Sequence, residues 1–81
     1  MNVLGFEVKL LKLTKNGILY RTRIEIHIGQ PQFILTQIMC GNIIKNIMTY
    51  LGQEGFFDEI LPDELVIFDD KEEAVNIGDL V

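Results

Sequence analysis

Apolar and polar residues alternate along residues 18–28, which predicts a β-strand with one buried face. One face carries Ile18, Tyr20, Thr22, Ile24, Ile26 and Ile28, and the other carries Leu19, Arg21, Arg23, Glu25 and His27. Residues 3–13 are equally rich in β-branched and long apolar side chains, and Lys15-Asn16-Gly17 lies between the two segments as a turn signal. The pattern therefore predicts an N-terminal β-hairpin with Tyr20 on its core-facing side.

This hairpin has two alternative registers. A two-residue Asn16-Gly17 turn is the commonest hairpin connection, but it places Phe6 opposite His27 and mixes the apolar and polar faces. A three-residue loop with Gly17 in the left-handed conformation instead pairs Phe6 with Ile26, Val8 with Ile24 and Leu10 with Thr22. Because a slip of one residue moves every side chain to the other face, the hydrophobic pattern favours the three-residue loop.

The spacing of apolar residues changes to that of a helix after Pro31, which suits a first helical turn. Positions in alternating steps of four and three hold Phe33, Gln37, Cys40, Ile44, Ile47 and Leu51. This stripe predicts a helix of roughly twenty residues from Phe33 to a stop at Gly52. The alternative is a strand over residues 33–39 and a shorter helix after an Asn42 N-cap, because Gly41 is costly inside a helix.

The C-terminal part contains shorter elements. Residues 56–61 suit one helical turn, 65–68 a buried strand, 69–71 a turn and 73–77 a final strand. The whole chain is expected to be a single α+β domain, residues 1–81, with the long helix packed across a small mixed sheet. The order of hairpin, helix and late hairpin resembles the layout of ubiquitin-like β-grasp domains. The chain has no C-terminal Gly-Gly, so the conjugation and sulfur-carrier roles of such domains are not expected.

Composition adds three constraints. Cys40 and His27 are the only cysteine and histidine, which excludes an internal disulfide and leaves too few ligands for a Cys/His zinc site. No apolar run is long enough to span a membrane and the N-terminus does not resemble a signal peptide, so we expect a cytoplasmic protein. Twelve Ile, one Ala and no Ser are the bias of an AT-rich genome, such as those of many phages and low-GC bacteria.

Charge is divided unevenly along the chain. Residues 1–50 carry six Lys/Arg against two acids, a net charge of +4, and residues 51–81 carry one Lys against ten acids, a net charge of −9. The acidic candidates are Asp58, Glu59, Asp63, Glu64, Asp69, Asp70, Glu72 and Glu73. Their spacing does not match a calcium loop, so we interpret them as a solvated surface or as a strip that binds a basic partner. Nucleic-acid binding by the basic hairpin is not favoured, because the chain is acidic overall and Tyr20 is expected to point inward.

No residue set has the pattern of a catalytic or cofactor site. His27 is expected to be an exposed strand residue beside Glu7 and Glu25, and Cys40 a buried structural thiol on the core stripe. The chain has no serine for a Ser-His-Asp arrangement and no Gly-rich phosphate loop. We therefore expect no enzyme activity, no cofactor and no metal.

The surplus of apolar side chains is the main functional signal. The chain is 48% hydrophobic, and a domain this small has little interior. The candidate interaction residues are Ile34, Leu35, Ile38 and Met39 on the helix, and Leu11, Leu13 and Leu19 at the hairpin tip. Unless the C-terminal elements cover them, they would be buried by a partner.

The sequence thus favours a non-enzymatic protein-interaction or regulatory module that forms a homodimer. Two other hypotheses remain open. One is a phage- or mobile-element-encoded inhibitor of a host protein, in which the acidic C-terminal half mimics nucleic acid. The other is a nucleic-acid-binding regulator that uses the basic hairpin.

Overall fold

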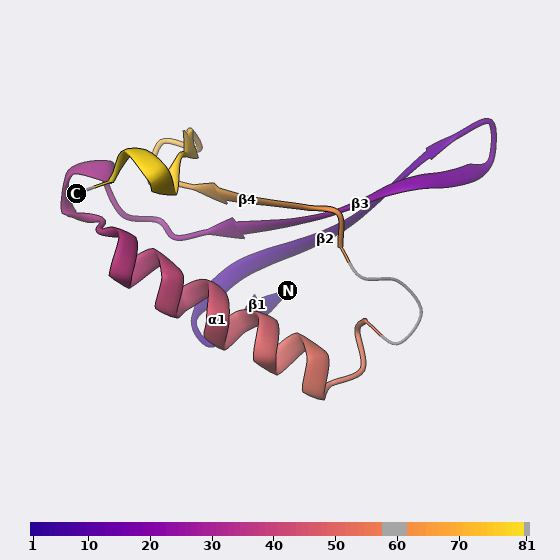
Figure 1. The fold of residues 1–81 in the computed structure, drawn as a ribbon, viewed down its shortest axis with the longest axis horizontal. Helices are drawn as coiled ribbons and strands as arrows, with labels where there is room; N and C mark the ends of the chain where they lie inside the picture. The colour runs from indigo at the N-terminus through magenta and orange to yellow at the C-terminus, as the bar shows by residue number, and fades with distance from the viewer. Residues whose placement is uncertain (58–61, 81) are drawn as a thin grey trace.

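The computed structural model describes residues 1–57 and 62–80, which form one five-stranded mixed sheet with a helix packed against one face (Figure 1). The strands lie in sequential order, β1-β2-β3-β4-β5. Their bounds are β1 Asn2–Val3, β2 Phe6–Lys15, β3 Ile18–His27, β4 Glu64–Phe68 and β5 Ala74–Val75, and the helix α1 spans Gln37–Gln53. The predicted α+β class, with one long helix across a mixed sheet, is confirmed.

The first predicted strand is divided in two. Leu4 and Gly5 have φ angles of 53° and 92° and form a tight turn between β1 and β2. β1 then folds back on β2 in an antiparallel pair, with Val3 opposite Phe6. Gly5, which adopts a positive φ without steric cost, was the signal in the sequence for this turn.

The hairpin of β2 and β3 combines features of both predicted registers. Asn16 and Gly17, with φ of 53° and 78°, form the two-residue turn that the hydrophobic pattern disfavoured. Lys15 pairs with Ile18 beside this turn. A β-bulge between Leu13 and Thr14 then shifts the register, so that Val8 lies opposite Ile26 and Leu10 opposite Ile24. The predicted three-residue loop was wrong. The extra residue of the bulge, Tyr20, lets a favourable turn coexist with matched apolar faces.

The predicted helix begins later than expected. A short 3-10 helix, η1, spans Gln32–Ile34, and Leu35 and Thr36 are extended before α1 begins at Gln37. Thr36 is the N-cap, because its hydroxyl accepts a hydrogen bond from the Met39 amide at 3.1 Å. The alternative with a strand at 33–39 and an Asn42 cap was also wrong. At the other end α1 passes the expected stop at Gly52.

The chain after α1 returns to the sheet beside β3. β4 pairs with β3 in parallel, with Ile24 opposite Leu65 and Ile26 opposite Ile67, so β3, α1 and β4 form a crossover unit. β5 pairs with the end of β4 and is shorter than the predicted strand 73–77, since a second 3-10 helix, η2, occupies Ile77–Asp79. Part of the predicted helical turn at 56–61 lies outside the described residues.

The core lies between α1 and the sheet. Cys40, Ile47 and Leu51 of α1 are completely buried, and they share one apolar cluster with Val8, Ile24, Ile26 and Ile67 of the sheet. The opposite face of the sheet carries the polar set predicted for residues 21–27. Within the described part of the chain, no helix has the length and hydrophobicity needed to cross a membrane.

Candidate interaction surfaces

Four exposed apolar side chains lie where the chain enters α1. Their exposed fractions are 88% for Phe33, 43% for Ile34, 77% for Ile38 and 39% for Met39. We call these four residues the apolar patch. Sequence reasoning placed Phe33 on the core-facing stripe and so missed it, because the stripe assumed one unbroken helix.

Leu35 does not belong to this surface, although the sequence predicted it there. It is 4% exposed and packs in the hydrophobic core. Its backbone is extended between η1 and α1, and its side chain is buried whereas those of Ile34 and Ile38 are exposed. Thr36, three residues before Met39 and able to cap a helix, was the available sign that the helix begins after Leu35.

The leucines of the hairpin are less accessible than expected. Leu11, Leu13 and Leu19 are half-buried, and the bulge places Leu19 opposite Thr14 and thus on the other side of the hairpin from Leu13. Instead Ile18 and Tyr20, predicted to face the core, are 71% and 60% exposed. The hairpin extends beyond the end of β4 and of α1, so no layer covers its tip (Figure 1).

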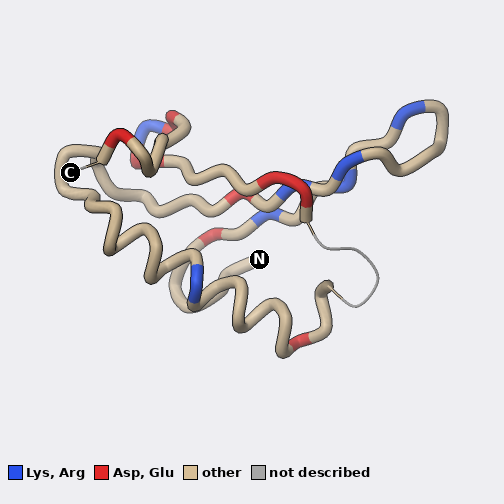
Figure 2. Tube along the Cα trace, viewed as in Figure 1, with Lys and Arg blue, Asp and Glu red and all other residues tan. Residues whose placement is uncertain are grey.

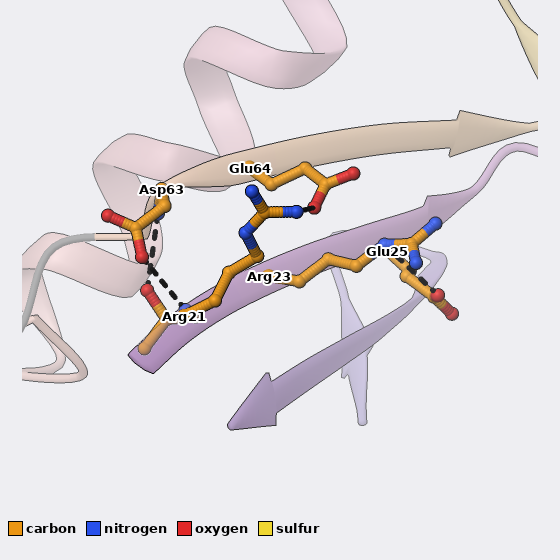
Figure 3. Close-up of polar contacts among 6 residues, drawn as sticks. Arg21, Arg23, Glu25, Asp63 and Glu64 are labelled. Atoms are coloured by element: carbon orange, nitrogen blue, oxygen red, sulfur yellow. Dashed lines mark hydrogen bonds and ion pairs between the residues drawn. The ribbon is translucent and has the colours of Figure 1, made fainter. Parts of the chain in front are cut away.

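The basic and acidic parts of the chain meet along the β3–β4 pair (Figure 3). Asp63 accepts a hydrogen bond from the Thr22 amide at 3.0 Å, and the Asp63 amide donates to the Thr22 carbonyl at 3.1 Å. Arg21 forms an ion pair with Glu64 at 3.4 Å, and Arg23 forms one with Glu25 at 3.5 Å. The uneven charge is therefore partly neutralised within one copy of the chain.

His27 is held among carboxylates and an aromatic ring. Its Nδ1 lies 2.7 Å from a Glu72 oxygen, its Nε2 lies 3.6 Å from a Glu25 oxygen, and its ring stacks on Phe68 with centroids 4.8 Å apart. The prediction of an exposed histidine was wrong, because 13% of the side chain is accessible. This packing leaves little room for a substrate at the imidazole.

The remaining acids are separated rather than gathered on one strip. Asp63 and Glu64 lie at the start of β4, whereas Asp69, Asp70, Glu72 and Glu73 surround the turn after its end (Figure 2). Asp58 and Glu59 lie outside the described residues. Among the residues that are described, no three His, Cys, Asp or Glu side chains come close enough to hold a metal ion.

Asp69 differs from the other described acids because its side chain organises a turn. It is 3% exposed, and its carboxylate accepts hydrogen bonds from the amides of Lys71 and Glu73 and from the Gln32 side chain at 2.8, 2.9 and 2.8 Å. The bond from Glu73 is the main reason that the pKa of this carboxyl lies below its ordinary value. Asp69 is thus a structural residue, not part of an accessible acidic surface.

Neither the Cys40 thiol nor the groove beside the hairpin presents an activated nucleophile among the described residues. Cys40 is buried in the core, and burial raises its pKa, which disfavours the nucleophilic thiolate. A groove of about 400 Å³ lies between the hairpin and the segment after α1, lined among others by Leu10, Lys12, Ile24, Phe56 and Phe57. Its described lining contains no carboxylate, imidazole or thiol.

Comparison with protein-family models, with curated proteins and with solved structures returned no match. The β-grasp resemblance therefore gains no support beyond the order of the elements.

Proposed function

We propose that this chain is a non-enzymatic protein-interaction module that forms a homodimer through the apolar patch. The observation that carries the proposal is the exposure of Phe33 and Ile38, 88% and 77%, beside the half-exposed Ile34 and Met39. Burying a side chain of this size is worth about 2 kcal/mol. Covering such a side chain with the surface of a partner would therefore stabilise the complex.

A second copy is the partner that the charge distribution favours. No Lys, Arg, Asp or Glu occurs between residues 28 and 44, the segment that contains the whole patch. In a twofold symmetric interface each surface meets itself. A patch without charge can meet its own copy without like-charge repulsion, whereas the basic hairpin and the acidic turn after β4 cannot.

The test is the mass of the protein in solution after Ile38→Asp. Ile38 is the second residue of α1, where an acidic side chain is compatible with the helix dipole, so the fold should survive. Size-exclusion chromatography with light scattering should find a dimer for the wild type and a monomer for Ile38→Asp at micromolar concentration. Circular dichroism should be the same for both.

Ile18→Asp is the matched control, since Ile18 is 71% exposed but lies at the hairpin tip. This variant should remain dimeric. A monomeric wild type, or a dimer that survives Ile38→Asp and is lost in Ile18→Asp, would contradict the proposal.

A further inference from the structure

A second surface, independent of the apolar patch, lies along the outer edge of β2. β1 covers only the beginning of this strand, where Val3 pairs with Phe6 and Asn2 with Glu7. The amide and carbonyl of Val8 exchange hydrogen bonds with Met1 at 2.7 and 2.8 Å. After Val8, no strand within residues 1–57 and 62–80 pairs with this edge, although β2 continues to Lys15.

The backbone geometry identifies which groups are left free. In a β-strand, successive residues direct their amide and carbonyl groups to opposite edges. The backbone amide and carbonyl of Val8 point toward β1 and away from β3. The backbone amides and carbonyls of Leu10, Lys12 and Thr14 therefore point away from β3 as well. They form a row of alternating donors and acceptors, which is what an added strand requires.

The side chains beside this edge are basic. Lys9, Lys12 and Lys15 of β2 are exposed, and none of them forms an ion pair with another described residue. The arginines of the neighbouring strand differ, since Arg21 and Arg23 are each paired with a glutamate. The lysines of the hairpin that form no ion pair with a described residue thus all belong to β2, the strand with the open edge, and Figure 2 shows basic residues along the hairpin.

The opposite edge of the same hairpin already pairs with a strand, β4, whose first residue is acidic and whose other four residues are apolar. The segment beginning with Asp63 and Glu64 lies parallel to β3, joined by backbone hydrogen bonds and by the Arg21–Glu64 ion pair (Figure 3). The chain therefore contains one example of a strand whose acidic end, Asp63 and Glu64, lies beside an arginine of this hairpin.

From these observations we propose that the β2 edge, Lys9–Lys15, binds an extended acidic segment of another protein by strand addition. A second copy is disfavoured there, because pairing β2 with itself would bring two sets of lysines together. Nucleic acid is also disfavoured, since the chain carries a net charge of −5 and a polynucleotide does not present the alternating amide and carbonyl groups that this edge would pair with.

The first experiment measures fluorescence anisotropy with a labelled ten-residue peptide of alternating glutamate and valine. Two further peptides carry N-methyl groups on the odd or on the even residues. An added strand uses the amides of alternate residues only, so each of these peptides can still pair through its unmethylated residues and should bind, whereas a peptide methylated on every residue should not bind. Binding of the fully methylated peptide with the affinity of the parent would overturn strand addition.

The second experiment tests the charges and separates this proposal from the homodimer. Changing Lys9, Lys12 and Lys15 to Gln should weaken peptide binding by roughly ten-fold, because exposed ion pairs are individually weak. Lys45→Gln, on the exposed side of α1, is the control and should have no effect. Ile38→Asp should also leave peptide binding unchanged, so either proposal can fail without the other.

A short DNA duplex and a single-stranded RNA of mixed sequence complete the experiment as competing probes. If they bind and the acidic peptide does not, the edge serves nucleic acid and the proposal is wrong. If none of the probes binds at low salt, the lysines serve only to keep the free edge from aggregating, and the proposal is again wrong.

Discussion

Leu35 and Ile38 lie three positions apart and have opposite environments. Leu35 is 4% exposed and Ile38 is 77% exposed, although both are large aliphatic residues of one apolar segment. The difference arises because Leu35 is extended between two helical elements, while Ile38 already belongs to the first turn of α1. Residue type alone indicated that this segment was too apolar to be solvated, but it could not distinguish the core residue from the surface residues.

Asp69 has a residue-level effect with a defined pH dependence. The pKa of its carboxyl is lowered in the folded protein from the ordinary value of 3.8, chiefly by the hydrogen bond from the Glu73 amide. A lowered pKa means that the ionised form contributes stability above the unfolded-state pKa. That contribution is lost as the pH falls from about 3.8 through the lower pKa of the folded state.

We therefore expect Asp69→Asn to lower the urea midpoint of unfolding at neutral pH. The difference in urea midpoint from the wild type should narrow as the pH falls below about 3.8, because the wild type then loses the ionised carboxylate too. Urea titrations from neutral pH into this acidic range measure the difference. Asp70→Asn is the control, since Asp70 is exposed and should show little difference at any pH. If the difference in urea midpoint between the wild type and Asp69→Asn stayed constant as the pH falls, the ionised Asp69 carboxylate would not be the source of the stabilisation.

At the scale of elements, the hairpin shows how two opposed local preferences are both satisfied. Asn16-Gly17 favours a two-residue turn, and the alternating pattern favours Val8 and Leu10 on one face with Ile24 and Ile26. The bulge at Tyr20 inserts the one residue needed to reconcile them. Both preferences were visible in the sequence, but the bulge was not, because no residue pattern marks it.

The start of α1 is also decided by a local interaction, the Thr36 cap. Replacing the capping hydroxyl by Thr36→Ala should destabilise the protein by about 1 kcal/mol, because the Met39 amide loses its acceptor. Chemical denaturation monitored by circular dichroism measures the change.

Thr49→Ala provides the comparison for this cap. The Thr49 hydroxyl donates to the Lys45 carbonyl within α1, and alanine is a better helix former, so this change should be neutral or slightly stabilising. Equal destabilisation by both substitutions would show that the effect at Thr36 is not due to capping.

At the scale of the whole molecule, the two proposed surfaces lie at opposite ends. The apolar patch is at the start of α1 and the basic hairpin projects at the far end of a body 40 Å long (Figure 1). This separation leaves the β2 edge accessible in a dimer formed through the patch.

A dimer also makes stability depend on protein concentration. The midpoint of thermal unfolding of the wild type should rise with concentration, because association stabilises the folded state by mass action. The midpoint of Ile38→Asp should not change. Differential scanning calorimetry over a hundred-fold concentration range measures the unfolding midpoints of both proteins. A wild-type midpoint that does not change with concentration would argue against the homodimer.

The sequence by itself determined the fold class, the type of the main elements and the division of charge. Alternation over residues 18–28, helical spacing before Gly52 and the division of charge are all local properties, and the α+β class follows from them. The tertiary structure alone decided which apolar side chains the core accepts, and which charges are neutralised at the β3–β4 pair. The physical reason is that burial and pairing depend on residues far apart in the chain, whose relative position is set only when the sheet and α1 pack together.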